Sequence, residues 1–245
     1  MRRRALVTAS AAGIGLVAVR ALREAGWEVV LSDLPDSDGA ALAAECGAEW
    51  VPCDLRDPAQ IGALAQAAGD VGLLVNNGGI AGPTAPVVEV RPEAWAEVLA
   101  VNLTAPFLLS RALVPGMVAA GSGLVVNMAS VAARIGHAGR SAYGTSKWGL
   151  LGFTAALARE VGAQGVRVNA ILPGSVRGER IASVIARYAE ANAIQVEEAE
   201  ARYLRRQATG RFVEPEEIAG MILFLASDAA RSVTGQFIGV DGGFE

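Results

Sequence analysis

The sequence has few of the residues from which metal sites and disulfide frameworks are built. Its 245 residues include two cysteines, Cys46 and Cys53, and one histidine, His137. The cysteines form no CxxC pair and no Cys/His cluster has metal-ligand spacing, so we expect neither a bound metal nor a disulfide scaffold. Two unpaired cysteines are typical of a reducing compartment, and the expected location is the cytoplasm.

Excess positive charge and long apolar runs are also missing. The net charge is −4, which argues against a basic surface that holds nucleic acid or an anionic membrane. No stretch reaches the roughly 18 unbroken apolar residues of a membrane helix, and the apolar run after Arg4 is too short for the core of a signal peptide. With 52% hydrophobic residues the chain can bury one sizeable core, and we expect a single domain over residues 1–245.

Short apolar runs alternate with segments of helical period. The predicted strands are 4–9, 27–33, 48–53, 71–76, 122–129, 165–171 and 236–240, and the predicted helices are 13–26, 38–46, 58–68, 92–119, 141–163 and 215–226. This order predicts an α/β fold with right-handed crossovers and a doubly wound parallel sheet covered on both faces. The charged helical stretch 175–210 interrupts the alternation and is interpreted as a lid on the substrate side.

The first predicted strand leads into a turn that carries two glycines, Gly13 and Gly15, and then into a helix. Such a turn aims the N–H groups of a helix N-terminus at a pyrophosphate, and glycine lets backbone and phosphate approach closely. Ala9 stands where a third glycine is usual. We predict a negative φ at Ala9, which leaves the dinucleotide site intact.

Asp33 closes the second predicted strand, eighteen residues after Gly15. A carboxylate there can accept hydrogen bonds from both hydroxyls of an adenosine ribose and would repel a 2′-phosphate. Neither Ala12 nor Leu34 supplies a compensating positive charge. The pattern predicts NAD(H) rather than NADP(H); the alternative is an ordinary solvated loop aspartate. Asp54 and the NNGG stretch at 76–79 follow the next two strands at the same edge, with turn chemistry as the alternative for the asparagines.

Tyr143 and Lys147 are four residues apart near the start of a helix, so both project from one helix face. A phenol has a pKa near 10, and an ammonium ~4 Å away at an effective dielectric of 20 contributes about 4 kcal/mol toward its ionisation. Burial opposes this effect. The pair is therefore a candidate acid–base unit, although packing explains most isolated Tyr/Lys pairs. Ser130 ends the fifth strand. Asn102 lies in the helical segment 92–119, where asparagine is unfavourable and therefore suggests a functional role; the alternative is an asparagine that bonds its own helix.

These motifs occur in the order and spacing of one family. The chain resembles the short-chain dehydrogenases/reductases of about 250 residues over essentially its whole length. The resemblance rests on Thr8–Gly15 (TxxxxGIG), Asp54, NNGG, Asn102, Ser130, YxxxK at Tyr143 and Lys147, Pro173-Gly174 and VTGQFIGVDGG. It implies a seven-stranded Rossmann fold and a homotetramer or homodimer built on helices 92–119 and 141–163 and the C-terminal segment.

The resemblance also assigns roles. Tyr143 would donate and accept the proton, Ser130 would orient the substrate oxygen, Lys147 would bind the nicotinamide ribose, and Asn102 would hold a water. The implied cofactor-binding residues are Thr8, Ser10, Gly13, Ile14, Gly15, Asp33, Leu34, Asp54, Leu55, Asn76, Gly78, Tyr143, Lys147, Pro173, Gly174 and Val176. The substrate candidates are Ser130, Tyr143, His137 and Arg177. Arg177 and Arg180 follow Pro173-Gly174 and are candidates to bind a carboxylate or phosphate; the alternative is that both face solvent or pair with acids. The alternative for His137 is a solvated loop residue.

Two further departures from the family pattern are Gly79 in place of alanine, which we expect to be mild, and Gly178 in place of a threonine that bonds the nicotinamide amide. That amide would then rely on the backbone near Val176. The expected activity is NAD(H)-dependent interconversion of a secondary alcohol and a ketone. The alternatives are an NADPH-dependent 3-oxoacyl reductase, against which Asp33 argues, and a non-catalytic nucleotide-binding regulator, which would have no need of the four catalytic positions.

Overall fold

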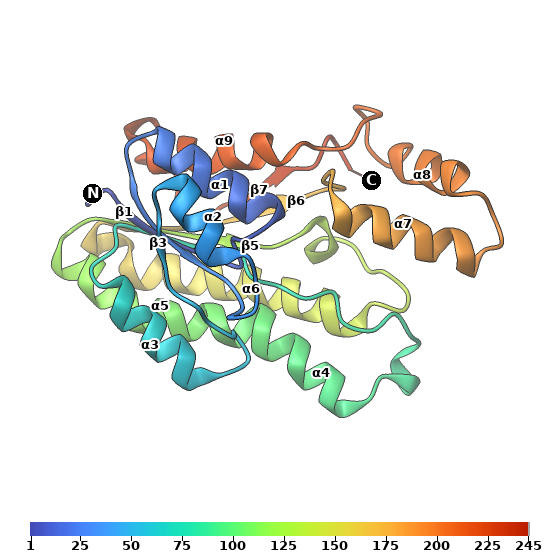
Figure 1. Cartoon of the computed structure of the whole chain (residues 1–245), viewed down its shortest axis with the longest axis horizontal. Helices are drawn as coiled ribbons and strands as arrows, with labels where there is room; N and C mark the ends of the chain where they lie inside the picture. Colours follow the sequence, from blue (N-terminus) through green and yellow to red (C-terminus); the bar gives the residue numbers. More distant parts are fainter. Residues whose placement is uncertain (245) are drawn as a thin grey trace.

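Seven parallel strands form the centre of the molecule in the order β3-β2-β1-β4-β5-β6-β7 (Figure 1). The computed structural model describes residues 1–244. The strands are β1 Arg4–Thr8, β2 Glu28–Ser32, β3 Glu49–Trp50, β4 Leu73–Asn76, β5 Gly123–Met128, β6 Val166–Pro173 and β7 Phe237–Val240. The strand order reverses between β1 and β4, and ligands of open α/β sheets bind at the carboxyl ends of strands at such a point. The predicted doubly wound Rossmann fold is confirmed.

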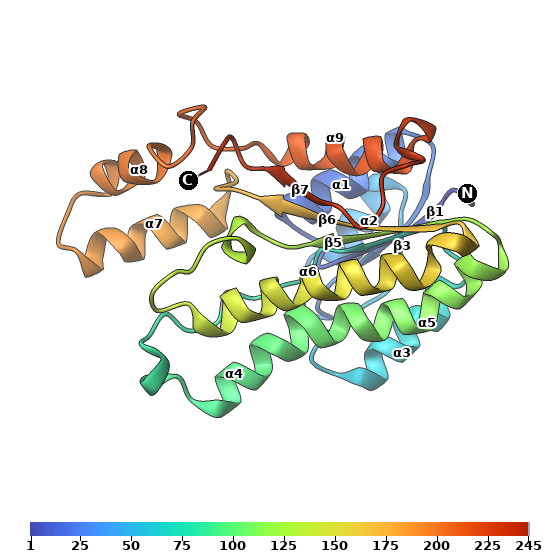
Figure 2. The same ribbon diagram turned by 180° about the vertical axis from the view of Figure 1, so that it is seen from behind.

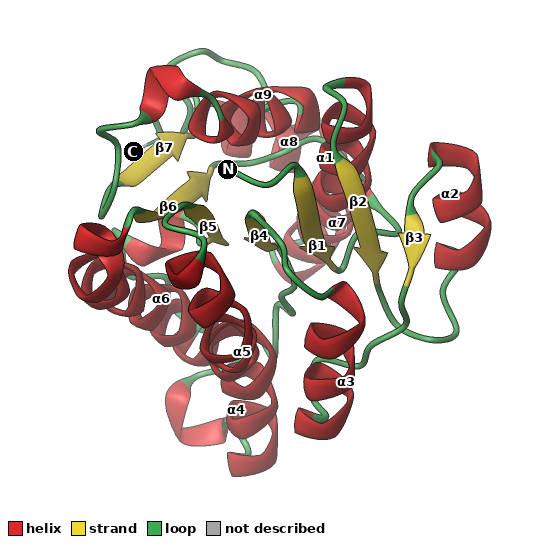
Figure 3. Ribbon diagram, turned by 90° about the vertical axis from the view of Figure 1, so that its left-hand side faces the viewer, coloured by secondary structure: helices red, strands yellow, loops and turns green. Residues whose placement is uncertain are grey.

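Helices cover both faces of the sheet (Figure 3). On one face lie α1 Gly13–Glu24, α2 Gly39–Cys46 and α9 Pro215–Ala226; on the other lie α3 Pro58–Ala68, α5 Ala105–Ala119 and α6 Ser141–Val161. Both faces of the central strands are therefore buried, and Ala5 to Thr8 of β1 are each at most 1% exposed. This double burial is why the strands read as continuous apolar runs rather than alternating ones.

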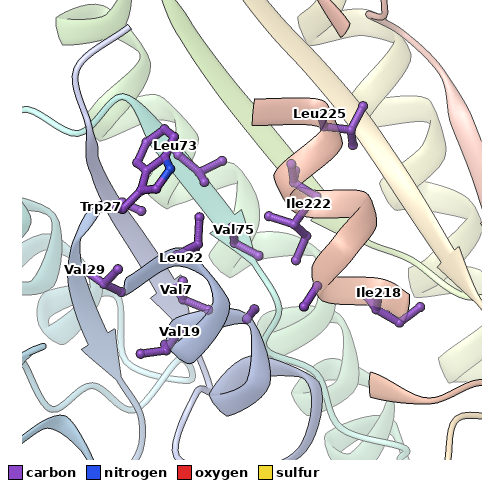
Figure 4. Close-up of a cluster of buried hydrophobic side chains, with 14 of the residues drawn as sticks. Val7, Val19, Leu22, Trp27, Val29, Leu73, Val75, Ile218, Ile222 and Leu225 are labelled. Carbon is purple, nitrogen blue, oxygen red and sulfur yellow. The ribbon is translucent and has the colours of Figure 1, made fainter. Parts of the chain in front are cut away.

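The core between α1, α9 and the sheet shows how the layers interlock (Figure 4). Leu22 of α1 and Ile222 of α9 point toward Val7 and Val75 on the adjacent strands β1 and β4, and all four are fully buried. The first strand and its helix are thereby held rigidly at the point where the sheet reverses. The turn that joins β1 to α1 is therefore held in a fixed position at both ends.

Strand β3 is shorter than the predicted 48–53, and Pro52 explains the difference. The backbone N–H of Val51 still donates to Leu31, and that of Cys53 donates to Asp33, but proline has no N–H to continue a ladder. The chain nevertheless runs beside β2 as far as Cys53. It therefore delivers Asp54 to the same edge of the sheet as Asp33.

The predicted helix 92–119 is interrupted by a turn that was not predicted from the sequence. It consists of α4 Pro92–Leu99, a π-helical turn at Ala100–Thr104, and α5. By length and composition this helix could cross a membrane, but half of its most apolar window is buried inside the protein, as in a core helix. A π-turn inserts one extra residue into the helix and re-aims the side chains within it. Asn102 lies in this turn and is fully buried.

The stretch predicted as a lid forms two helices, α7 Glu179–Ala191 and α8 Val196–Leu204. They extend beyond the carboxyl ends of the strands at one end of the molecule (Figures 1 and 2). They have a small apolar core of their own, made of Ile185, Ala189, Ala199 and Phe212. The pair is thus a packed unit beside the edge at which β5 and β6 end.

Candidate active site

The turn after β1 presents a row of backbone donors. Helix α1 begins at Gly13 after Ala12, which offers no side-chain cap. Within residues 1–244 the backbone N–H groups of Gly13, Ile14 and Gly15 have no acceptor. Unpaired N–H groups at a helix N-terminus, together with the positive end of the helix dipole, suit a pyrophosphate. The residues present therefore fit a dinucleotide cofactor.

Ala9 has a φ of +49°, so the predicted negative φ is wrong. Bonds to neighbouring segments hold the alanine there. The next residue's N–H donates to Ser32 at 3.0 Å, and Asn77 Nδ2 donates to the carbonyls of Thr8 and Ala9 at 3.0 and 2.8 Å. Left-handed backbone costs a non-glycine residue about 1 kcal/mol or more. The turn thus adopts the geometry that a glycine would relax into, at a modest cost.

Ala9→Gly should raise the free energy of unfolding by about 1 kcal/mol at most, because relief of the left-handed strain exceeds the extra freedom of glycine in the unfolded chain. Coenzyme affinity should be unchanged, because the turn already has its bound shape. Urea denaturation with and without coenzyme measures both. A destabilisation of more than about 0.5 kcal/mol would contradict the strain at Ala9.

Gly15 is required by close packing rather than by its φ. A Cβ at this position would lie 2.5 Å from the carbonyl oxygen of Ala9 and 2.7 Å from Asn77 Nδ2. The start of α1 therefore packs directly on the turn. Ser10, by contrast, turns its hydroxyl inward to donate to the carbonyl of Val7 at 2.8 Å and is fully buried. Ser10 thus stabilises the turn, and its side chain does not face the cofactor space.

Asp33 lies at the end of β2 beside the turn. One carboxylate oxygen accepts from the N–H of Ala11 and the other from the N–H of Leu34, each at 2.8 Å. The carboxylate has no ion-pair partner in the part of the chain that the structure describes. It is partly exposed next to the donors of α1, and Leu34 beside it is 40% exposed. Spare lone pairs on both oxygens are available for ribose hydroxyls.

Asp54 and Leu55 line the next part of the edge. The carboxylate of Asp54 pairs with Arg56 at 2.6 Å, and this hydrogen-bonded guanidinium lowers the pKa of Asp54. Leu55 packs against Gly78 so closely that any side chain at Gly78 would overlap it. The glycine therefore allows the loop after β4 to pass beside the loop after β3.

The asparagines after β4 act mainly as braces. Asn76 is buried and donates to Asn127 at 2.8 Å, which places it behind the cofactor edge rather than on it. Thr8 Oγ1 accepts from the N–H groups of Asn77 and Gly78, each at 3.1 Å. The loop is thus tied to the end of β1. Asn77 was not among the predicted cofactor residues, and its only sequence signal was turn chemistry.

Ser130, Tyr143 and Lys147 converge at the ends of β5 and α6. Lys147 Nζ lies 5.8 Å from the centroid of the Tyr143 ring and donates to the carbonyl of Met128 at 2.7 Å. Lys147 is only 3% exposed. Ser130 follows β5, accepts from the N–H of Ala132 at 3.2 Å and hydrogen-bonds with Tyr143. The structure therefore brings three of the four predicted catalytic residues into direct proximity.

The surroundings of Tyr143 favour its ionisation. Burial raises the pKa of the phenol, but Lys147, Arg180, the Ser130 hydrogen bond and Arg140 together lower it below its ordinary value. Burial also lowers the pKa of the Lys147 ammonium, to about 8, although Tyr143 opposes this. The direction for Tyr143 agrees with the sequence expectation. The contributions of Arg140 and Arg180 to this lower pKa were not predicted from the sequence.

Asn102 connects this group to the cofactor edge. Its Oδ1 accepts from the N–H of Ile80 at 2.8 Å, while its Nδ2 donates to the Ile80 carbonyl and to Ser146 Oγ, each at 3.0 Å. Asn102 therefore does not bond its own helix, which was the alternative interpretation. Both Nδ2 hydrogens are used, so a water beside this side chain could only donate to the remaining lone pair of Oδ1. Ser146 is a buried link in this network rather than a surface residue.

Position 79 lies close to this network, so that even a methyl group there would be crowded. A Cβ there would lie 3.3 Å from both Asn102 Oδ1 and Lys147 Nζ. These are tight contacts that a small shift of a neighbour would relieve. The replacement of the family's alanine is therefore mild, as expected.

The segment after β6 supplies backbone at the same edge. Gly174 packs against Asp241, where a Cβ would lie 2.8 Å from the aspartate backbone. Val176 bridges to Val213, which fixes the chain just beyond Pro173. Gly178 has a φ of +145°, and no atom lies within 4 Å of where its Cβ would be. Gly178 has no side-chain hydroxyl. A nicotinamide amide would therefore have to hydrogen-bond the backbone near Val176, which the bridge to Val213 holds in place.

Two of the substrate candidates, Arg177 and His137, are not among the groups that act on the pKa of Tyr143. Arg177 pairs with Glu214 at 2.9 Å and stacks over Phe212. His137 is half-buried, and burial, with help from Arg206 and Arg140, lowers its pKa. The arginines that face Tyr143 are instead Arg140 and Arg180, whose guanidinium carbons lie 4.8 and 5.8 Å from the ring centroid. Of the two arginines that the sequence offered as anion-binding candidates, Arg177 and Arg180, only Arg180 faces Tyr143.

Known proteins are similar to this chain over nearly its whole length. A family model described as enoyl-(acyl carrier protein) reductase matches residues 8–245. The cis-4-hydroxycyclohexanecarboxylate dehydrogenase of Sinomonas cyclohexanicum is 37% identical over 98% of this chain and 95% of its own. The D-beta-hydroxybutyrate dehydrogenase of Cupriavidus necator is 35% identical over 98% and 96%.

A solved structure agrees with these relatives. A tryptophan variant of actinorhodin polyketide ketoreductase with NADPH superposes with a TM-score of 0.93 at 34% identity, covering 99% of this chain and 97% of that one. Tyr143 and Lys147 lie close together, and the turn before α1 presents its unpaired N–H groups where the strand order of the sheet reverses. The ketoreductase structure has the same fold. The chain therefore belongs to the short-chain dehydrogenase/reductase family, whose members use a nicotinamide nucleotide to interconvert alcohols and ketones.

Proposed function

We propose that this protein is an NAD(H)-dependent oxidoreductase that interconverts a secondary alcohol and a ketone, with Tyr143 as the acid–base group. The observation that carries the proposal is that Lys147 lies 5.8 Å from the Tyr143 ring centroid and that Lys147 and Ser130 both lower the pKa of the Tyr143 phenol. A bound nicotinamide ring supplies or accepts the hydride in this chemistry.

The chain's own residues handle the proton and the substrate oxygen. Ser130 donates a hydrogen bond to the oxygen that changes between hydroxyl and carbonyl. Tyr143 takes the hydroxyl proton during oxidation and returns a proton during reduction. Lys147 and Arg180 stabilise the phenolate by their charge. The Asn102–Ile80 bonds hold the loop after β4 in position beside Lys147.

The preference for NAD(H) rests on Asp33. Its unpaired carboxylate would lie close to a 2′-phosphate and repel it, whereas it can accept ribose hydroxyls. The ketoreductase structure that holds NADPH is the observation in favour of the other coenzyme. Neutralising Asp33 separates these two possibilities.

With NAD⁺ the kcat/KM of the wild-type protein should exceed that with NADP⁺ by at least ~100-fold, because a like-charge contact costs several kcal/mol and each 1.4 kcal/mol is tenfold. Asp33→Asn should reduce the ratio to within about tenfold. Asp36→Asn, which removes an exposed charge from the same loop, is the matched control and should leave the ratio unchanged. A wild-type preference for NADP⁺ would overturn the charge argument.

The alternative activity is an NADPH-dependent 3-oxoacyl reductase. Acetoacetyl-coenzyme A with NADPH, compared with acetoacetate and NADH, distinguishes it from the proposed function. A non-catalytic regulator on the same fold would bind a coenzyme and turn over neither compound. Retention of Asn102, Ser130, Tyr143 and Lys147 argues against the regulator, since Lys147 and Ser130 both act on the Tyr143 phenol.

We also propose a cytoplasmic homo-oligomer, a homotetramer or homodimer. Two large aromatic side chains support it, since Phe107 on α5 and Trp148 on α6 are 45% and 53% exposed. Neighbouring exposed aromatics on packed helices are typical of protein interfaces. The absence of disulfides at Cys46 and Cys53 supports the reducing location.

A further inference from the structure

Positively charged side chains surround the open side of Tyr143. Arg140 immediately precedes α6, and Arg180 lies in the first turn of α7. Arg187 is seven residues further along α7, so it shares a helix face with Arg180. The end of the molecule that carries α7 also carries the start of α6 (Figure 2). The lid and the catalytic helix thus bring three guanidinium groups to the substrate side of the site.

None of the three guanidinium groups has a carboxylate partner within residues 1–244. Their contacts are single bonds to neutral oxygens: Arg140 to Thr84 at 3.4 Å, Arg180 to the Gly79 carbonyl at 3.4 Å and Arg187 to the Ser183 carbonyl at 3.2 Å. A guanidinium has five N–H donors. Most of the donors in this cluster are therefore free.

Two other arginines of the segment 175–210 are paired with carboxylates. Arg177 is bound to Glu214 at 2.9 Å, and Arg202 is bound to Glu198 at 2.7 Å. These pairs lie outside the contacts of Tyr143. Carboxylates thus neutralise Arg177 and Arg202 but not Arg180, which lies over the Tyr143 ring.

Charges of one sign held together at a partly buried site repel one another. Burial lowers the pKa of Arg140, Tyr143 raises it, and the charges of Arg180 and Arg187 lower it further. No carboxylate is among the groups that act on Arg140. An anion that enters this space relieves the repulsion and gains charge-assisted, bidentate hydrogen bonds.

We propose that Arg140 and Arg180 bind a carboxylate of the substrate, so that the alcohol is a hydroxy acid and the ketone is an oxo acid. This inference rests on the proposed oxidoreductase function. Both guanidinium groups lie within 6 Å of the Tyr143 ring centroid, at 4.8 and 5.8 Å. The carboxylate must therefore be separated from the reacting carbon by only a few bonds. Arg187 adds to the positive field from one helix face.

Binding of unreactive acids tests the subsite without relying on turnover. Cyclohexanecarboxylate and butyrate are compared with their neutral amides by isothermal titration calorimetry, with and without NADH. The carboxylates should bind at least about tenfold more tightly than the amides. Arg140→Gln and Arg180→Gln should each weaken carboxylate binding by about 10- to 100-fold. Arg180→Lys should retain part of the affinity, which guards against a simple folding defect.

Arg202→Gln removes a charge from the same lid and serves as the control, with no expected change. Equal binding of acids and amides, or full carboxylate affinity in both glutamine variants, would overturn the inference. Inorganic phosphate is tested in parallel. If it binds through these arginines while the carboxylates do not, the subsite belongs to a phosphorylated substrate and the inference is wrong.

Kinetics separate this inference from the proposed function. 3-Hydroxybutyrate and 4-hydroxycyclohexanecarboxylate are compared with their methyl esters, and the esters should have the higher KM. Equal turnover of acids and esters would remove the carboxylate subsite but leave the oxidoreductase. If the protein binds carboxylates through these arginines but binds no coenzyme, the carboxylate subsite is supported and the proposed oxidoreductase function is wrong.

Discussion

Tyr143→Phe should lower kcat by about 10²- to 10⁴-fold in both directions of the reaction, the usual contribution of a positioned acid–base group. The variant keeps the ring beneath Arg140 and Arg180 and removes only the hydroxyl that carries the proton. Coenzyme affinity should change little, because the N–H groups of α1 and the carboxylate of Asp33 lie at other points of the edge. The measurement is steady-state turnover beside calorimetric titration of NADH.

A tyrosine on the lid provides the control for this variant. Tyr188 on α7 packs edge-to-face on Tyr203 and accepts a hydrogen bond from Arg202 at 3.4 Å. Tyr188→Phe removes a hydroxyl from the same chain at a site without catalytic contacts and should retain activity. If Tyr143→Phe remains fully active on any alcohol or ketone, the acid–base assignment fails.

The parallel sheet with helices on both faces was predictable because the strands are continuous apolar runs. Runs such as Ala5–Thr8 are apolar on both faces, and only strands covered by helices on both sides require that. Strand ends were harder, since the early end of β3 depends on Pro52. Asp33 and Asp54 lie at one edge as predicted, because parallel strands bring their carboxyl ends together, whereas Asn76 is buried against Asn127 behind that edge.

The geometry of single residues was not predictable where distant segments impose it. Ala9 has a positive φ because Asn77 and Ser32, far along the chain, bind the peptides around it. The π-turn at Asn102 likewise depends on bonds to Ile80 and to Ser146 on α6. The asparagine itself was the only sequence signal. Propensity describes local preference, whereas these conformations are tertiary.

The direction of the lid arginines shows the same limit. Arg177 and Arg180 are three residues apart, and Gly178 with a φ of +145° turns the chain between them. Glu214, which lies 37 residues further along the chain, captures Arg177. Arg180 is left to face Tyr143. No local pattern distinguishes the two, so the sequence offered both as anion-binding candidates, and only the fold selects one.

Lys147→Met should move the pH dependence of alcohol oxidation upward. Oxidation requires the phenolate of Tyr143, and below the phenol pKa the reactive fraction falls tenfold per pH unit. Lys147 is the strongest of the groups that lower this pKa against the effect of burial. In the wild-type protein the rising limb of kcat/KM should therefore lie below the ordinary tyrosine value of about 10. In the variant it should shift upward, with a rate loss of at least ~100-fold at pH 7.

The variant is chosen so that charge is the main change. Methionine fills a similar volume and adapts to irregular packing, although it leaves the Met128 carbonyl without its 2.7 Å donor. That loss affects stability, and thermal melting reports it separately. Lys147→Arg retains the charge and should keep the limb low even if crowding reduces the rate. A Lys147→Met profile with the wild-type limb would show that the ammonium does not set the acidity of Tyr143, because a packing role changes the rate at every pH equally.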